Sequence, residues 1–537
     1  MRGEAPAFLR IPPFPGARVQ SFAVEAQGCS HLAQPEVDGL LSLIRRERVG
    51  GSYWGKQPLL PSNHKVVSVR DPVLRAKLLR DIDPGNAFCC DIRETYDPWH
   101  LVTGAAEVIA DADDELILIA AIAGVPALCV GEGRFAMLDS RVPSSPALSE
   151  ALRSEFERCA FIDPFTGSRM NPHEAVKLSG FWRQLIDSNR DLTRAFGVAR
   201  WKRPTVAPLL WSGERSVRFG GSVQDEQGGA AAVWRSRVRT GTLQALQADG
   251  CRLVEIEDGF IRSSGLGADC VPPQSIIVDR RGIYFDPAYE SDLEHIIQTW
   301  QFSPELLGRA RELRELIVAI GISKYEASRT LVSPKRPGHH SILVPGQVED
   351  DRAVIVGGQG LTSNLELLRR VRSREPGAHI IYKPHPDVEA GHRKGAIPDE
   401  ECLAVADEIV REGAISQLID RAREVHVNTS LAGFEALLRD KPVTTYGVPF
   451  YAGWGLTTDL GVVPDRRSAR RTVDELVAAA LIVYPRYVDP KSGLPCPPEV
   501  LVNRLAEGPP ATIQSSPLVW MRRLQGRTRR RLAKLAR

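Results

Sequence analysis

One strand end in the last third of the chain constrains its fold more than any other feature. A short apolar run, Ile380 to Tyr382, breaks into Lys383-Pro384-His385-Pro386. This order is typical of a buried parallel strand that ends in a rigid loop, because prolines interrupt the pairing of a sheet. It predicts an α/β fold and places the imidazole of His385 at the carboxyl end of a strand.

A second strand end repeats this plan further along the chain. The strand Val425 to Val427 leads through Asn428-Thr429-Ser430 into a helix expected from Leu431 to Arg439. The hydroxyls of Thr429 and Ser430 then lie at a helix N-terminus, which favours an anion. Ligands of open α/β sheets lie outside the carboxyl ends of strands, so His385 and these hydroxyls are expected to contact one phosphate. Glu435, about one helical turn further on, is expected to accept hydroxyls of an attached sugar.

Some of these residues also have other interpretations. Thr429 and Ser430 are of the types that cap helices. A metal site of His385, Asp387 and His392 lacks a standard spacing, and we expect no metal.

Long strings around these residues resemble the bacterial capsule β-Kdo transferases of the KpsC and LipB type. The strings follow the family's order and cover about residues 200 to 505. They are EDGFIRSSGLG (257 to 267), VDRRGIYFDP (278 to 287), VPGQVEDD (344 to 351), YKPHPDV, TSLAGFEALL, KPVTTYG and PFYAGWGLT. Trp234-Arg235-Ser236-Arg237 stands where the family has a WGxK-like string, but it lacks the glycine.

The resemblance implies an α/β fold of the GT-B glycosyltransferase type, with two Rossmann-like domains and a CMP-sugar between them. The implied donor-binding residues are His385, Lys383, Thr429, Ser430, Glu435 and Arg262, although Lys383 and Arg262 equally suit structural ion pairs. The acidic Glu257-Asp258 pair is implied to perform the chemistry, with Asp258 as the preferred nucleophile. No cofactor is expected besides the donor substrate, CMP-β-Kdo.

The function implied is a retaining β-Kdo transferase that extends a lipid-linked saccharide in capsular polysaccharide biosynthesis. Retention follows from two displacements at one carboxylate. Two alternatives stay open. One is an inverting CMP-sugar transferase that uses Asp258 as a general base, and the other is a non-catalytic capsule export or scaffold protein.

Four regions are expected along the chain. Residues 1–195 resemble a degenerate C-terminal half of a first transferase module. Residues 196–335 form the first Rossmann-like domain with the acidic motif, residues 336–510 form the second, which binds the CMP-sugar, and residues 511–537 form a basic membrane-surface tail. In the acidic domain, the order of strand, helix and strand up to Ile256 predicts a parallel sheet, which a strand from Ser275 to Val278 continues.

The first region contains a faint internal repeat of the last. EVIADADDELILIAAIAGVPALCVG (107 to 131) stands where EVHVNTSLAGFEALLRDKPVTTYG does in the second copy. Asp113-Asp114 then replace Thr429-Ser430, and Ile119 replaces Glu435. We therefore expect no phosphate site in this copy. The alternative is an unrelated α/β domain that matches by chance.

Charge and composition indicate the compartment and the partners expected for the protein. The net charge is +3, yet residues 521 to 537 alone carry eight cations and no acid, so the rest of the chain is near −5. This tail suits an anionic membrane better than nucleic acid. Nine scattered cysteines and no apolar run of spanning length favour a reducing cytosol and a peripheral position on the inner face of the cytoplasmic membrane. The expected partners are CMP-Kdo, a lipid-linked acceptor and other capsule-assembly proteins.

Overall fold

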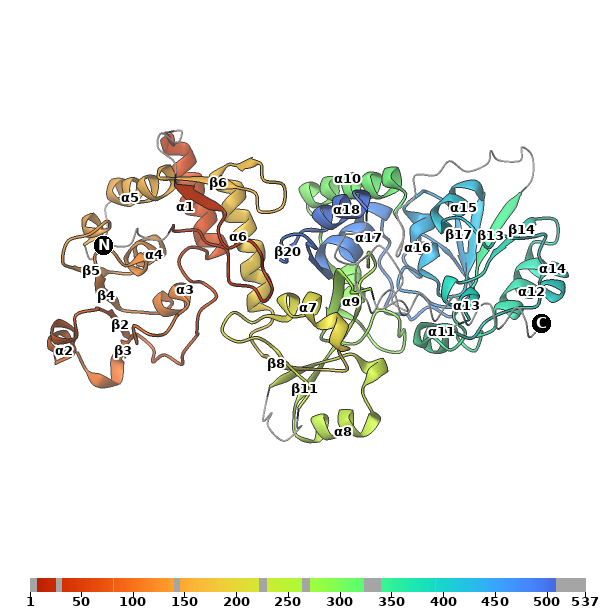
Figure 1. Ribbon diagram of the computed structural model, residues 1–537, viewed down its shortest axis with the longest axis horizontal. Coiled ribbons are helices and arrows are strands. Elements are labelled where there is room, and N and C mark those ends of the chain that lie inside the picture. The colour runs from red at the N-terminus through yellow and green to blue at the C-terminus, as the bar shows by residue number, and fades with distance from the viewer. Residues whose placement is uncertain are drawn as a thin grey trace. The chain divides into compact units, whose positions relative to one another are not determined.

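The computed structural model describes residues 7–25, 31–80, 82–139, 145–221, 229–262, 271–322, 340–391 and 393–508. The tail predicted at 511–537, residues 263–267 of EDGFIRSSGLG, the expected connector before His340, and His392 lie outside the described residues. The chain forms two compact units (Figure 1). The first comprises Met1–Leu192, Leu210–Val217 and Lys491–Leu494, and the second comprises Thr193–Leu209, Arg218–Pro490 and Pro495–Arg537.

The first unit contains two sheets. A parallel four-stranded sheet has the order β3-β2-β4-β5, and a small antiparallel sheet has the order β1-β6-β7. The strands are β1 (Ala23–Glu25), β2 (Lys65–Ser68), β3 (Ala87–Cys89), β4 (Glu107–Asp111), β5 (Ala127–Val130), β6 (Cys159–Ile162) and β7 (Arg169–Met170). The main helices are α1 (Gln34–Glu47), α2 (Pro72–Arg80), α4 (Glu115–Ala123), α5 (Ser145–Glu157) and α6 (Pro172–Asp187).

The second unit begins with a mixed seven-stranded sheet of order β20-β19-β12-β11-β10-β8-β9. Its strands are β8 (Leu192–Phe196), β9 (Arg218–Phe219), β10 (Ala230–Val233), β11 (Arg252–Asp258), β12 (Ser275–Asp279), β19 (Pro485–Val488) and β20 (Pro495–Cys496). The helices beside it are α7 (Arg203–Val206), α8 (Thr240–Ala248), α9 (Asp292–Thr299) and α10 (Pro304–Ile320).

The predicted all-parallel pairing of this sheet is wrong beyond β11. Strands β10 and β11 are parallel, but β12 runs antiparallel to β11 and to β19. The reason lies in the connection. Gly259 N donates to Ser275 O and Gln274 N donates to Arg262 O, so the chain folds back on itself directly after β11. A parallel neighbour would require a crossover over the sheet face instead.

The second sheet of this unit is six-stranded and entirely parallel, with the order β15-β14-β13-β16-β17-β18. This is the order 3-2-1-4-5-6 of a doubly wound sheet, whose direction of winding switches between β13 and β16. The strands are β13 (Ser341–Pro345), β14 (His379–Lys383), β15 (Glu408–Ile409), β16 (Glu424–Val427), β17 (Val443–Thr445) and β18 (Thr458–Asp459). The helices include α11 (Arg352–Gly357), α12 (Asn364–Arg374), α13 (Pro386–Glu389), α14 (Asp399–Leu403), α15 (Ile415–Arg421) and α16 (Leu431–Leu437).

The apolar runs of the sequence form the core of this sheet. Ile342, Val344, Ile380 and Tyr382 are buried against Leu368 and its neighbours on α12. Strands buried on both faces lack an alternating pattern, which is why these runs are continuous.

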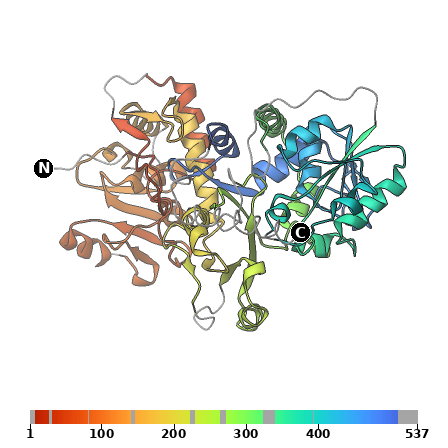
Figure 2. The same ribbon diagram turned by 45° about the vertical axis from the view of Figure 1, so that its right-hand side comes forward.

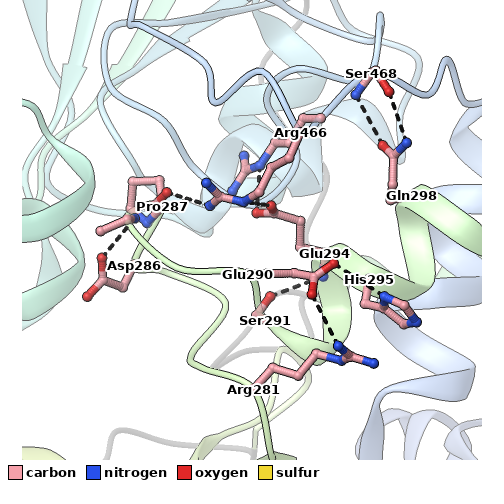
Figure 3. Close-up of polar contacts among 12 residues, drawn as sticks. Arg281, Asp286, Pro287, Glu290, Ser291, Glu294, His295, Gln298, Arg466 and Ser468 are labelled. Atoms are coloured by element: carbon pink, nitrogen blue, oxygen red, sulfur yellow. Dashed lines mark hydrogen bonds and ion pairs between the residues drawn. The ribbon is translucent and has the colours of Figure 1, made fainter.

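After β18 the chain returns to the seven-stranded sheet. Helix α17 (Val473–Val477), the π-helical segment 478–483 and α18 (Pro498–Ala506) pack on α10, and β19 pairs with β12 (Figure 2). The returning segment is held to α9 by polar contacts (Figure 3). Glu294 accepts from Arg466 and, at 2.9 Å, from Arg467, while Gln298 Nε2 donates to Ser468 Oγ at 3.0 Å.

The two units share a succession of elements. In the first, β4, α4 and β5 precede a hairpin, β6–β7, and then helix α6. In the second, β16, α16 and β17 precede the hairpin β19–β20 and then α18. The parallel order β3-β2-β4-β5 also corresponds to β14-β13-β16-β17.

Candidate active site

The carboxylate of Asp258 ends β11 between two cations. Lys202 Nζ lies 3.1 Å from Oδ1, and Arg262 Nε lies 2.8 Å from Oδ2. Arg262 also donates to Val271 O at 2.9 Å, which fixes its guanidinium to the backbone. Each oxygen of the carboxylate therefore has its own cation.

Glu257 precedes Asp258 on β11. Successive side chains of a strand face opposite sides of the sheet, so Glu257 and Asp258 do not share a face. Glu257 Oε1 instead accepts from the backbone N–H of Asp258 at 3.0 Å. Lys202 and Arg262 both pair with Asp258.

Lys202 is buried, and it lies on the indole ring of Trp234. Its Nζ is 3.4 Å from the ring centroid. Burial lowers the pKa of Lys202, while the nearby Asp258 and Glu257 oppose that shift. The contact with an aromatic face is one that stabilises an ammonium away from water.

His385 has a defined place at the end of β14. It is the N-cap of α13, and its Nδ1 accepts from the backbone N–H of Asp387 at 3.1 Å. Because Nδ1 is the acceptor, the proton of the neutral ring is assigned to Nε2. A ring nitrogen that donates is what a phosphate oxygen requires.

Thr429 and Ser430 follow β16 as expected, and Gln347, which follows β13, contacts the first of them. Gln347 Nε2 donates to Thr429 Oγ1 at 2.9 Å, and Gln347 Oε1 accepts from Thr429 N at 3.0 Å. Ser430 caps α16 by accepting from Ala432 N at 3.3 Å. Glu435 is buried in the same helix, which ends at Leu437 rather than at the predicted Arg439. These groups surround the switch between β13 and β16.

Two residues predicted to contact the donor have other neighbours. Lys383 Nζ donates to Arg411 O at 2.8 Å, beyond β15. Arg262 pairs with Asp258 at the end of β11. The structure therefore assembles the sequence-predicted residues as two groups, with Arg262 and Asp258 in one and His385, Thr429, Ser430 and Glu435 around the six-stranded sheet.

An aromatic cluster joins the two groups. Phe260, two residues after Asp258, stacks on Phe450 with ring centroids 4.6 Å apart. Its ring also lies 6.1 Å from that of Phe434, which precedes Glu435. The loop after β11 thus packs directly against α16.

The corresponding position in the first unit has different chemistry. Asp114 caps α4 by accepting from Leu116 N at 3.0 Å, and its other oxygen accepts from Ser68 Oγ at 2.7 Å. Ile119 is fully buried. A carboxylate at this helix start repels a phosphate. Across the described residues of both units, no group of three His, Cys, Asp or Glu side chains is arranged to hold a metal ion.

Sequence reasoning missed Lys202 and Gln347. A signal existed for each, because Lys202 follows the strand β8 within Trp201-Lys202-Arg203 and Gln347 lies in VPGQVEDD directly after β13. What no local pattern supplied was the order of the strands that brings these ends together.

The chain resembles known proteins over about 60% of its length. The model of the family described as "Capsule polysaccharide biosynthesis protein" matches residues 232–334 and 312–487. The chain is 37% identical over 338 residues to the "Capsule polysaccharide modification protein LipA" of Neisseria meningitidis serogroup A. These 338 residues are 62% of this chain and 48% of LipA. The chain thus spans about half the length of LipA.

Two further relatives are covered more completely. The "Lipopolysaccharide-processing protein LpsZ" of Rhizobium meliloti is 37% identical over 328 residues, which are 59% of this chain and 74% of LpsZ. Among solved structures, "Thermosulfurimonas dismutans KpsC, beta Kdo 2,4 transferase" is 31% identical with a TM-score of 0.51, over 58% of this chain and 98% of that chain.

No helix within the described ranges is both long and apolar enough to cross a membrane.

Proposed function

The chain belongs to the capsule polysaccharide biosynthesis family, and from this premise we propose that it is a retaining β-Kdo transferase that uses CMP-β-Kdo. The similarity to a chain named as a β-Kdo transferase supports the sugar. One observation carries the reaction: a carboxylate at a strand end, Asp258, whose two oxygens are held by Lys202 and Arg262. The acceptor is a lipid-linked saccharide of the capsular polysaccharide.

The proposed chemistry consists of two displacements at the anomeric carbon of Kdo. An oxygen of Asp258 attacks that carbon as the bond to the CMP phosphate breaks, and CMP leaves with the electron pair. An acceptor hydroxyl then displaces Asp258, loses its proton to solvent or to a nearby base, and regenerates the carboxylate. Two inversions at one carbon give net retention.

CMP is proposed to bind at the switch between β13 and β16. His385 donates from Nε2 to the phosphate, the 429–430 turn lies beside it, and Glu435 accepts ribose hydroxyls. The positive groups near the departing phosphate stabilise its charge without rearranging during the reaction. In this scheme the two sheets of the second unit act as the two halves of a GT-B transferase, and no metal takes part.

The two cations on Asp258 favour this scheme over an inverting one. A general base must accept a proton from the acceptor, and cations beside a carboxylate weaken its affinity for protons. A nucleophile must instead be ionised and aligned, which the two cations promote. The anomeric configuration of the product separates the two routes.

One reaction tests the proposal. Purified protein is incubated with CMP-Kdo generated in situ and a Kdo-primed lipid analogue, and the product is analysed by NMR. We expect a new β-linked Kdo. A product with an inverted configuration would reject the retaining route, and no product together with no heat on titration with CMP would favour a scaffold.

Asp258→Asn supplies the matching variant. It should abolish transfer while leaving CMP affinity close to that of the wild type, because the carboxylate acts on the sugar and the nucleotide lies on the other sheet. Glu257→Gln is the comparison variant, since both Lys202 and Arg262 donate to the carboxylate of Asp258. Loss of activity in Glu257→Gln but not in Asp258→Asn would reverse the assignment.

A further inference from the structure

We propose that Lys202 is a positioning residue of this site. Through its contact with Asp258, it holds that carboxylate ionised and aligned. The inference rests on the proposed function for its catalytic consequence, but the contact itself can be tested without any substrate.

Three neighbouring strand ends build the contact. Thr193 Oγ1 donates to Ala230 O and Trp234 N donates to Phe196 O, so β8 and β10 run in the same direction. Strands β10 and β11 are also parallel. Lys202 follows β8, Trp234 follows β10 and Asp258 ends β11, and therefore all three arrive at one edge of the sheet.

The carboxylate of Asp258 is more exposed to solvent than the two cations that contact it. The side chains of Lys202 and Arg262 are 5% and 1% exposed, whereas that of Asp258 is 19% exposed. Trp234 is buried beneath the ammonium. Of these three side chains, that of Asp258 thus has the greatest access to solvent, and its two cations are buried. This arrangement suits a residue that acts through Asp258 better than one that binds the donor itself.

The charges of these groups also require the lysine. Asp258 and Glu257 carry two negative charges, which Lys202 and Arg262 balance. Without Lys202 the site would present a net negative charge to a sugar that carries its own carboxylate beside the reacting carbon. Burial lowers the pKa of Lys202, and Asp258 opposes that shift because it favours the charged form.

Carbodiimide labelling of carboxyl groups, read by peptide mass spectrometry, tests the contact directly. The reagent reacts with protonated carboxyl groups, so labelling of Asp258 against pH reports its protonation. In Lys202→Met we expect labelling of Asp258 to extend to higher pH, and Lys202→Arg should restore the wild-type profile. Lys202→Gln is the second variant if the methionine variant folds poorly, and CMP titration serves as the check of folding.

A second ion pair provides a matched control, because its carboxylate lies on β11, the strand that also carries Asp258. Arg235 pairs with Glu255 of β11, with Nε 2.6 Å from Oε1. Arg235→Met removes a cation from a carboxylate three residues before Asp258, and it should leave labelling of Asp258 unchanged. An identical Asp258 profile in Lys202→Met and the wild type would overturn the inference, whether or not the protein transfers Kdo.

Kinetics then test the catalytic consequence. Lys202→Met should lower kcat on the order of 100-fold, the usual effect of a small misplacement of a reacting group. CMP affinity should change little, because CMP itself lacks the sugar carboxylate, and the acidic limb of the kcat/KM profile should move to higher pH. Normal turnover in a variant with altered labelling would overturn the positioning role. Absence of transfer in the wild type would reject the proposed function alone, because labelling still decides the contact.

Discussion

At His385 the backbone determines which ring nitrogen donates. The N-cap hydrogen bond from Asp387 N occupies Nδ1, and this assigns the proton of the neutral ring to Nε2. The proline on each side restricts the loop further, so the imidazole has little conformational freedom to lose if it binds the proposed nucleotide.

His385→Ala should therefore weaken CMP binding by about 1.5 to 3 kcal/mol, the range for a hydrogen bond to a charged group. Isothermal titration measures the loss. His379→Ala is the matched control, since His379 begins the same strand at its opposite end. Equal CMP affinity in folded His385→Ala and the wild type would remove His385 from the nucleotide site.

At the scale of elements, one carboxylate joins three of them. Asp279 ends β12, accepts from Asp292 N at the start of α9 at 3.0 Å, and accepts from Tyr484 Oη at 2.7 Å. Burial, with Asp292 as the next cause, raises the pKa of Asp279 to about 6 from 3.8. A raised carboxyl pKa stabilises the fold at low pH, and that stability is lost as pH rises through about 6.

We expect the wild type to gain stability relative to Asp279→Asn as pH falls from 7 to 4. Two pKa units correspond to about 3 kcal/mol at most. Urea unfolding of both proteins across this range gives the difference in the free energy of unfolding. A constant difference would show that Asp279 titrates alike in the folded and unfolded chains.

The paired helix caps of the two units give a second test at this scale. Asp114 caps α4 and Ser430 caps α16, so replacing either with alanine should cost about 1 kcal/mol of stability. Only Ser430→Ala should weaken CMP binding, and Asp114→Ala should leave turnover and product linkage unchanged. A product with two distinct Kdo linkages from the wild type would reveal a second site and contradict this expectation.

At the scale of the whole molecule, the shared succession of elements supports the hypothesis that the first unit is a degenerate copy of the second. The elements that the first unit shares with the second start with β1, which pairs antiparallel with β6 as β12 does with β19. Helix α1 then corresponds to α10, and both end in a left-handed residue, Arg48 and Gly321. Within its described residues, no counterpart of β10 and β11 supplies an acidic strand end.

The last prediction is that the basic segment 511–537 binds an anionic membrane surface. Each cation near an anionic membrane contributes about 1 kcal/mol, so its eight cations suffice for reversible binding at low salt. Truncation after Ser516 should release the protein from phosphatidylglycerol liposomes, and high salt should have the same effect. Transfer to a soluble acceptor should persist. Equal sedimentation of the full-length and truncated proteins would locate the attachment elsewhere.

The sequence by itself determined which residues end strands. Apolar runs that stop at proline or at polar turns are local features, so the α/β class and the strand-end positions of His385, Thr429, Ser430 and Asp258 followed from the chain alone. The resemblance to capsule Kdo transferases added the chemistry expected of these residues, and the comparisons confirm the family.

Only the tertiary structure decided which strand ends meet. Pairing between distant strands depends on packing over the whole sheet, and no local pattern encodes it. For this reason the antiparallel course of β12 was missed, as were the contact of Lys202 with Asp258 and that of Gln347 with Thr429. A side chain pairs with the charge that the folded sheets bring closest, whatever its distance along the sequence.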